Sequence, residues 1–486
     1  MQSTRNGVAL AAAFTLASAA LANVALAATP EDEAAALRAE LDATRSAFQA
    51  RIDALEARLR QLEQENAPGT ATTAGTAVRS ERLDAIESRL DRVERVAASA
   101  PTTPAPSAFN PQMSVILAGS WNNLSDDPEE YRLAGFIPGG EESGPGSRGF
   151  SLGESEMTLS ASIDPRFYGQ VTFAVSPDNE IGTEEAFFRT TALRGGLTAQ
   201  AGRFYSALGY VNGQHAHAWD FADIPLAYQA MLGGQYATDG AQLKWLAPLE
   251  TFVELGVELG NGHAFPGADD GNGVGAWTLF ASAGNDIGAS ASWKAGVSWL
   301  HTDAEDRGYE EADPTLACAG NPTTFSGDSA LWNAYAVYKW APGGNSRERN
   351  LKLQAEYFAR TEDGALSQQN AALGDGTADY RSEQSGWYAQ AVYQFVTNWR
   401  LGLRWDRLDA GSTRLAFREG LLTAADFPAL EDYSPDRGTV MLDWSPSEFS
   451  RLRLQYAHDR SAPGEADEQV YLQYLMSLGA HGAHQF

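Results

Sequence analysis

The chain has 486 residues, with 63 acidic and 35 basic side chains and a formal net charge of -28. This balance argues against a nucleic acid as a partner, because phosphate binding depends on Lys and Arg. Mean hydropathy is -0.32, and beyond the N-terminus no segment approaches the eighteen or so uninterrupted apolar residues that a membrane helix needs. Any membrane crossing beyond the N-terminus must therefore be made by strands, whose alternating side chains average to a near-neutral hydropathy.

The N-terminus has the features of an export signal. Arg5 is the only charge in the first 28 residues, an apolar run follows from about Val8, and Ala25-Leu26-Ala27 offers a small-x-small cleavage site. Together these features predict a secretory signal peptide over residues 1–27. An N-terminal membrane anchor is the alternative.

Residues 28–100 have a helical period. Leu41, Phe48, Leu55 and Leu62 are each seven apart, and the pattern resumes near Leu83 after a spacer rich in Gly, Pro and Thr. This spacing predicts a periplasmic coiled coil. A single helix buries such a narrow apolar stripe poorly, so we expect the chains to associate as a homotrimer. The alternative is a single amphipathic helix on the barrel or on peptidoglycan. A Pro-rich linker is expected at 101–108.

From residue 109 onward the period changes to two, as in Phe167, Gly169, Val171, Phe173 and Val175. Short connections are predicted at 164–166, 194–196, 247–250, 285–288, 341–349, 397–398 and 445–449. Mostly longer polar connections are predicted at 122–147, 176–183, 207–239, 260–273, 302–329, 362–383, 411–436 and 460–468. Seven turns and eight loops join sixteen strands. An even strand number with this asymmetry is typical of an outer-membrane barrel.

The expected fold class is therefore all-β: a 16-stranded antiparallel transmembrane β-barrel over 109–486, preceded by an N-terminal α-helical coiled coil. Both ends of the barrel and the coiled coil are expected in the periplasm. A large secreted sandwich or propeller is the alternative. The last strand alternates from Val470 and ends on Phe486, as outer-membrane barrels do. We therefore expect Phe486 to act as an assembly signal for the barrel-assembly machinery, and the barrel to contact outer-membrane lipid and lipopolysaccharide.

Strand number, loop asymmetry and the terminal Phe resemble the trimeric 16-stranded general porins over 109–486. The stretch 202–235, GRFYSALGYVNGQHAHAWDFADIPLAYQAMLGGQ, and the ending SLGAHGAHQF are similar to porin-like outer-membrane proteins that carry a coiled coil. Those proteins are often labelled zinc-regulated or TonB-dependent receptors. A TonB-dependent receptor, however, needs a plug ahead of a 22-stranded barrel, and neither is predicted here.

The third long connection, 207–239, is unusually apolar for an exposed loop, with Trp219, Phe221 and Leu226 among its residues. Connecting segments normally run over the solvated surface, so this one is expected to be buried. In general porins the third loop enters the lumen and narrows the pore. The resemblance therefore implies a constriction that includes His215, His217, Asp220 and Asp223.

Charged residues are expected to line the lumen, at the strand positions that alternate with the outward-facing apolar residues. They are Glu154, Glu156, Glu254, Glu258, Arg400, Arg404, Arg451 and Arg453. Loop carboxylates facing this Arg ladder across the lumen would create a transverse field; alternatively, the charges pair and hold the loop. Residues 98–486 contain 49 acidic and 24 basic side chains, which predicts modest cation selectivity.

The His215-Ala216-His217 run places two imidazoles on one side of an extended segment, with Asp220 close behind. Two His and a carboxylate are enough to begin a zinc or copper site. The sequence leaves open whether His215 and His217 bind a metal transiently or anchor the loop by hydrogen bonds. No other cofactor is expected.

The chain is not expected to be an enzyme, since it has neither an HExxH run nor a Cys placed beside a His. The function predicted from the sequence is passive diffusion of small hydrophilic solutes or ions through an outer-membrane porin. Two alternatives remain: a substrate-selective or metal-uptake channel, and an envelope tether that binds peptidoglycan through the coiled coil.

Overall fold

The computed structural model describes residues 111–139, 143–176, 180–268, 272–309, 321–370, 373–419 and 421–479. The predicted signal peptide, coiled coil and linker lie outside the described residues, as does Phe486. The barrel segment is described by itself below.

The described part of the chain consists mainly of strands. The strands are β1 (Gln112–Leu124), β2 (Gly149–Leu152), β3 (Ser155–Asp164), β4 (Phe167–Val175), β5 (Ile181–Thr190), β6 (Leu197–Tyr205), β7 (Ala237–Leu246), β8 (Phe252–Gly260), β9 (Ala276–Ile287), β10 (Ala291–Tyr309), β11 (Thr323–Trp340), β12 (Asn350–Gln368), β13 (Gly376–Val396), β14 (Trp399–Glu419), β15 (Asp436–Ser447), β16 (Ser450–Arg460) and β17 (Asp467–Gly479). The helical elements are α4 (Leu226–Leu232) and the 3-10 turns η1 (Pro128–Glu130), η2 (Ala216–Ala218), η3 (Pro342–Gly344), η4 (Ala424–Asp426) and η5 (Pro428–Leu430). The described residues contain no helix long and apolar enough to cross a membrane.

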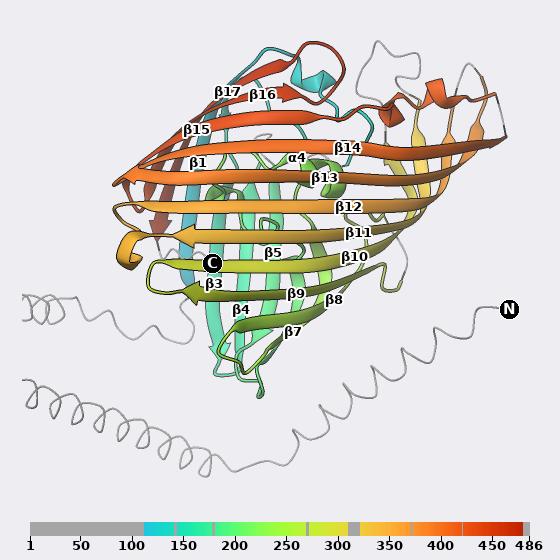
Figure 1. Cartoon of the computed structure of the whole chain (residues 1–486). Helices are drawn as coiled ribbons and strands as arrows, with labels where there is room; N and C mark the ends of the chain where they lie inside the picture. The colour runs from blue at the N-terminus through green and yellow to red at the C-terminus, as the bar shows by residue number, and fades with distance from the viewer. Residues whose placement is uncertain are drawn as a thin grey trace, which may run out of the picture. The chain divides into compact units, whose positions relative to one another are not determined.

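The strands form one closed antiparallel barrel (Figure 1). From β3 onward each strand pairs with the next along the chain, and β1 pairs with β17 from Ser114↔Gly479 to Leu124↔Gln469. Both β2 and β3 pair with β1, so they form one position in the barrel, interrupted at Gly153. A Cβ on Gly153 would lie 2.8 Å from the Cβ of Ala118. The seventeen named strands thus occupy sixteen positions, which confirms the predicted strand number.

The two faces of the barrel have opposite polarity. On β12, Leu353 and Tyr357 are exposed on the outer face, whereas Gln354 and Glu356 are buried inside. The same alternation leaves Leu403 and Leu454, among many other large apolar side chains, exposed on the outside. A continuous exposed apolar surface marks contact with something other than water. Apolar outside and polar inside is the pattern of a barrel that faces lipid.

The strands β10 to β14 are longer than the sequence predicted. The predicted loops at 302–329, 362–383 and 411–436 are wrong in extent, because β13 and β14 each run for 21 residues, whereas about 9–11 cross a bilayer. Beyond the segment that would contact lipid, apolar side chains no longer alternate along the outer face of these strands. The hydrogen-bonded pairing between the strands nevertheless continues. Ion pairs between neighbouring strands, Arg381–Asp363 and Arg418–Asp379, support the polar extension.

The outward position of Leu403 yields a stability prediction. In phospholipid vesicles, Leu403→Arg is expected to lower the free energy of unfolding by about 2–4 kcal/mol, the cost of Arg near the bilayer midplane. Ser412→Arg, at an exposed outward position on the polar extension of the same strand, is expected to cost less than about 1 kcal/mol. Urea titration followed by Trp fluorescence measures both, and equal losses would contradict contact between Leu403 and lipid.

Candidate functional site

The third loop, residues 206–236, is folded inside the barrel. All seven residues of α4 are buried, and α4 packs against β12, β13 and β14 (Figure 1). Leu208, Tyr228 and Met231 of the loop are fully buried in one cluster with Leu331 and Phe358 of the wall. The apolar composition of this loop therefore predicted its burial correctly.

Local chemistry shapes α4. Pro225 precedes the helix, where its missing N–H costs nothing, and Gly233 ends it with φ of 69°. The N–H of Gly233 donates to the carbonyl of Gln229, 3.0 Å away. Glycine is required at this position, because the backbone is left-handed and a Cβ would lie 2.2 Å from the carbonyl oxygen of Gly139.

Glu356 on β12 is the central acceptor for the loop. Its carboxylate accepts hydrogen bonds from the backbone N–H groups of Tyr210 and Val211, and from the hydroxyl of Tyr228. Two wall side chains, Asn333 and Tyr388, donate to the same carboxylate. The sequence analysis did not select Glu356, although it has the lumen-facing parity of β12.

Two loop carboxylates form ion pairs with the wall. Asp220 lies 2.9 Å from Nζ of Lys352 and 3.0 Å from Nη1 of Arg400. Asp223 lies 2.8 Å from Arg404 and 2.7 Å from Arg437.

Burial alone would raise the pKa of Asp220, but Lys352 and Arg400 hold that pKa well below its usual range. Burial opposes ionisation of Asp223 in the same way, yet Arg404 and Arg437 lower its pKa. Both loop carboxylates therefore remain ionised. They contact the Arg ladder directly and do not face it across the lumen, which corrects that part of the sequence prediction in favour of the alternative that the charges hold the loop.

Some of the other charges predicted for the lumen bind the third loop, and others lie on the wall as partly exposed ion pairs. Arg453 donates to the carbonyl of Trp219 at 2.8 Å, and Arg451 donates to the carbonyl of His217 at 3.3 Å. Glu258 accepts from the N–H of Ala207 at 2.8 Å. By contrast, Glu254 lies 3.6 Å from Lys244, and both side chains remain about a quarter exposed, at 23% and 26%.

Glu154 lies between β2 and β3 rather than within a strand. The ladder with β1 is interrupted at this point, so alternation does not fix which way this side chain points. Its place in the lumen stays a prediction.

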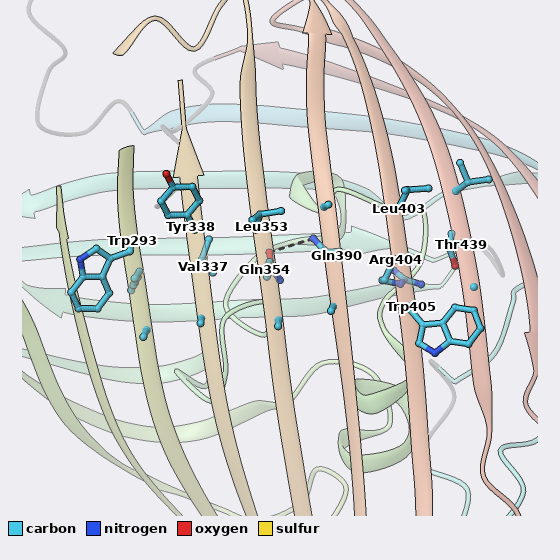
Figure 2. A pocket seen from close by; sticks show the side chains of 18 of the residues that line it. Trp293, Val337, Tyr338, Leu353, Gln354, Gln390, Leu403, Arg404, Trp405 and Thr439 are labelled. Carbon is cyan, nitrogen blue, oxygen red and sulfur yellow. Dashed lines mark hydrogen bonds between the residues drawn. The ribbon is translucent and has the colours of Figure 1, made fainter. Parts of the chain in front are cut away.

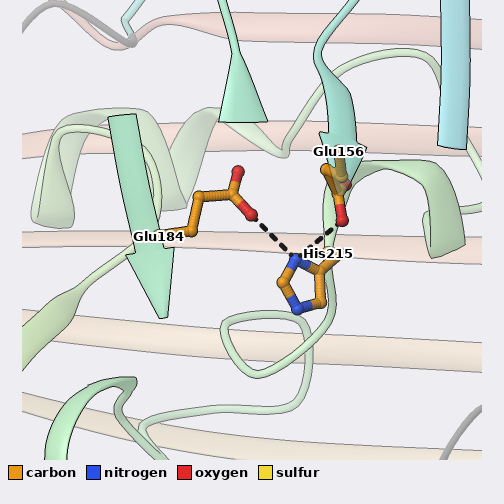
Figure 3. Close-up of side chains that lie close together, drawn as sticks. All are labelled: Glu156, Glu184 and His215. Carbon is orange, nitrogen blue, oxygen red and sulfur yellow. Dashed lines mark hydrogen bonds and ion pairs between the residues drawn. The ribbon is translucent and has the colours of Figure 1, made fainter. Parts of the chain in front are cut away.

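The loop histidines meet three carboxylates on the wall. Nδ1 of His215 lies 3.1 Å from Glu156 and 3.0 Å from Glu184 (Figure 3). Its Nε2 lies 3.2 Å from Glu185. His217 lies 2.8 Å from the second oxygen of Glu156. Asp220, which the sequence analysis grouped with these histidines, instead pairs with Lys352 and Arg400 on the opposite wall.

A β-bulge places the two consecutive acids of β5 on one side. In the β4–β5 pairing Thr172 faces Glu185 and Phe173 faces Thr183, so Glu184 is the extra residue. Consecutive residues of a regular strand point to opposite faces, and a bulge removes that constraint locally. Both Glu184 and Glu185 consequently reach His215. A bulge leaves no clear signal in a single sequence.

The first external loop is also buried in part. Ala134, Phe136 and Ile137 are almost fully buried, and the carbonyl of Gly135 accepts a hydrogen bond from Gln384 at 2.7 Å. The sequence analysis placed these residues in a polar loop. The short apolar run from Leu133 to Ile137 was the available signal.

A hollow with a volume of about 900 Å³ lies on the outer wall. Figure 2 shows Trp293, Tyr338, Leu353, Leu403 and Trp405 around it. The polar side chains of the same strands bind inside the barrel, as Arg404 does with Asp223. This hollow therefore offers an aromatic and aliphatic surface, which suits a hydrocarbon chain better than a hydrophilic solute.

Residues Gly149 to Gly153 have the Gly-x-Ser-x-Gly spacing of a hydrolase nucleophile turn. Such a turn links a strand to a helix and exposes the Ser hydroxyl beside a His. Here Ser151 lies within β2 and pairs with Ser120 of β1 at 2.8 Å. This run is therefore part of the barrel wall.

No protein-family model matches the chain. An uncharacterised protein of Aquifex aeolicus is 28% identical over 403 residues, which is 78% of this chain and 80% of that protein.

Among solved structures, OmpT, an outer-membrane protein of Vibrio cholerae, has a TM-score of 0.47 at 11% identity, covering 76% of this chain and 98% of that one. The outer-membrane channel DcaP of Acinetobacter baumannii has a TM-score of 0.45 at 13% identity, covering 76% and 97%. An anion-selective porin from Comamonas acidovorans has a TM-score of 0.43 at 10% identity, covering 76% and 99%.

The role of Glu356 is testable. Glu356→Gln replaces an acceptor oxygen by an amide donor among five donors, and we expect the loop to open more readily by about 2–3 kcal/mol. Hydrogen exchange at the amides of Tyr210 and Val211 should then accelerate by about 30-fold or more. Glu254→Gln, which alters an ion pair that is about a quarter exposed, is the control and should cost less than about 1 kcal/mol. Unchanged exchange in Glu356→Gln would refute the role of this carboxylate.

Proposed function

We propose that this chain is a passive diffusion channel of the bacterial outer membrane, through which small hydrophilic solutes pass without a chemical step. The observation that carries the proposal is a third loop fixed by ion pairs and hydrogen bonds to the inner wall of a closed, lipid-facing barrel. Glu356, Arg404 and Arg437 hold the loop against β12 to β15. Lys244 and Glu254 on the wall of β7 and β8 remain accessible to water.

The charge of the lumen bears on ion preference. The net charge of the chain predicts a preference for cations, and much of that charge is carried by acids in or near the external connections, such as Asp126 and Asp127. On the inner wall, however, Lys339 and Lys352 are direct neighbours across β11 and β12, and Lys294 lies on the adjacent strand β10.

Selectivity depends on the potential along the path of the solute more than on total charge. We therefore favour a preference for anionic solutes at this basic wall, and cation selectivity remains the competing prediction from the sequence.

The heptad pattern supports a homotrimer tied together by the N-terminal coiled coil in the periplasm. A substrate-selective or metal-uptake receptor is less well supported, since no separate plug domain is predicted and the element inside the barrel is a connecting loop anchored to its wall. An envelope tether that binds peptidoglycan remains the structural alternative, because the heptad segment suits either role.

Planar-bilayer recordings in a KCl gradient test both the channel and its preference. We expect steady conductance and a reversal potential whose sign shows that chloride is more permeant than potassium. Lys339→Glu should shift the permeability ratio toward potassium by roughly two-fold or more, since a unit charge about 10 Å from an ion in water contributes about 0.4 kcal/mol. Arg347→Glu, in a turn outside the lumen, is the control. Absence of conductance would refute the channel. If the channel prefers potassium and Lys339→Glu leaves the permeability ratio unchanged, then the acidic outer surface sets the selectivity and the lysines of the wall do not.

Deleting residues 31–97 separates the channel from the tether. The truncated chain is expected to conduct as the full chain does but to migrate as a monomer in native electrophoresis, because the seam that joins the subunits is gone. Loss of conductance in a folded, heat-modifiable barrel would contradict the assignment of solute passage to the barrel alone.

A further inference from the structure

The cluster around His215 combines residue types that bind metals, at the spacing that metals require. One oxygen of Glu156, one oxygen of Glu184 and Nδ1 of His215 lie within 4.8 Å of one another. Figure 3 shows both carboxylates directed at the same ring nitrogen. We propose that Glu156, Glu184 and His215 form a binding site for a divalent transition-metal cation between the third loop and the barrel wall.

The distances fit a common centre. The two oxygens lie 3.1 and 3.0 Å from Nδ1. Ligands bound tetrahedrally at about 2.0–2.1 Å from zinc lie roughly 3.3 Å apart. Small side-chain movements would therefore let all three atoms face one ion.

The outer contacts of the cluster match those of known metal sites. A His that binds a metal through one nitrogen usually donates its other N–H to a carboxylate, which fixes the ring. Here Nε2 of His215 lies 3.2 Å from Glu185, and Gln170 donates to that same carboxylate at 2.9 Å. The bulge at Glu184 thus provides one ligand and one orienting group from consecutive residues.

His217 extends the arrangement on the other side. Its Nδ1 lies 2.8 Å from the second oxygen of Glu156, and its ring stacks on that of His215 with centroids 5.7 Å apart. His217 therefore orients Glu156 as Glu185 orients His215.

The site is buried enough to hold an ion and open enough to receive one. The side chain of Glu156 is 2% exposed, whereas those of Glu184 and His215 are 11% and 19% exposed. An aqueous cation could reach the cluster through the lumen.

Binding would follow a simple balance. The Nδ1 proton of His215 leaves to solvent, the nitrogen lone pair binds the cation, and the charges of Glu156 and Glu184 offset its two positive charges. Three protein ligands leave a fourth position for water. One imidazole with two carboxylates suits zinc, manganese or ferrous ions better than copper(I), which prefers sulfur.

A second group offers a control. His301, Asp303 and Asp328 on β10 and β11 also lie close together, but both acids are exposed. Because both carboxylates are exposed to water, we expect this group to bind weakly.

The test is calorimetric titration of the chelator-treated full chain in detergent with zinc chloride alone. We expect one tight site per chain, with affinity about ten- to a hundred-fold lower in Glu184→Gln and in Glu185→Gln. His301→Gln should titrate like the unaltered chain. Cobalt(II) titration adds an independent signature, since a tetrahedral site gives visible absorption bands that Glu184→Gln should remove.

Heat-modifiable migration confirms that each variant is folded, and neither readout depends on channel activity. Three results would overturn the site: absence of a saturating zinc signal, identical titrations for Glu184→Gln and the unaltered chain, or loss of binding in His301→Gln. In each of those cases the cluster is a hydrogen-bonded anchor only.

Discussion

The structure depends on the pairing of charges between the third loop and the inner wall of the barrel. Arg404 and Arg437 are almost fully buried, and buried guanidinium groups without partners would cost several kcal/mol each. The loop supplies Asp223 to both. In return the wall supplies Glu356 to the loop backbone. The wall also contributes Asp406, which lies 2.8 Å from Arg404. Loop and wall therefore complete each other's pairing, which explains why a connecting segment can lie stably inside a polar barrel.

Apolar packing alone would not position the loop in this way. Lipid already covers the outside of the barrel, so the buried apolar cluster must form inside, around Tyr228 and Phe358. Hydrophobic contact is nondirectional and would tolerate several placements of α4. The ion pairs and the five hydrogen bonds to Glu356 are directional, and they select one placement. Function follows from that selection, because the position of the loop decides which wall remains open to water.

Much of the fold could be predicted from the sequence because its rules are local. A period of two identifies strands and assigns their faces, and Glu156, Glu258 and Arg404 each contact the third loop inside the barrel. The extent of β10 to β14 could not be predicted in this way, because polar hairpins outside lipid carry no apolar stripe. Glu184 and Glu185 were also missed. Their shared direction depends on a register shift between β4 and β5, which is a property of two strands and not of one segment.

The same loop separates two surfaces of opposite charge. On the side of β3 and β5, three carboxylates surround two imidazoles; on the side of β11 and β12, Lys339 and Lys352 lie side by side. A loop held by Asp220 to one wall and by His215 to the other therefore spans a gradient of charge within the barrel. A cation bound at the acidic side would reduce that gradient without moving the loop, since Asp220, Asp223 and Glu356 hold it independently. Ion binding and loop position would thus be separate properties of this interior, and each would contribute to the field inside the proposed channel.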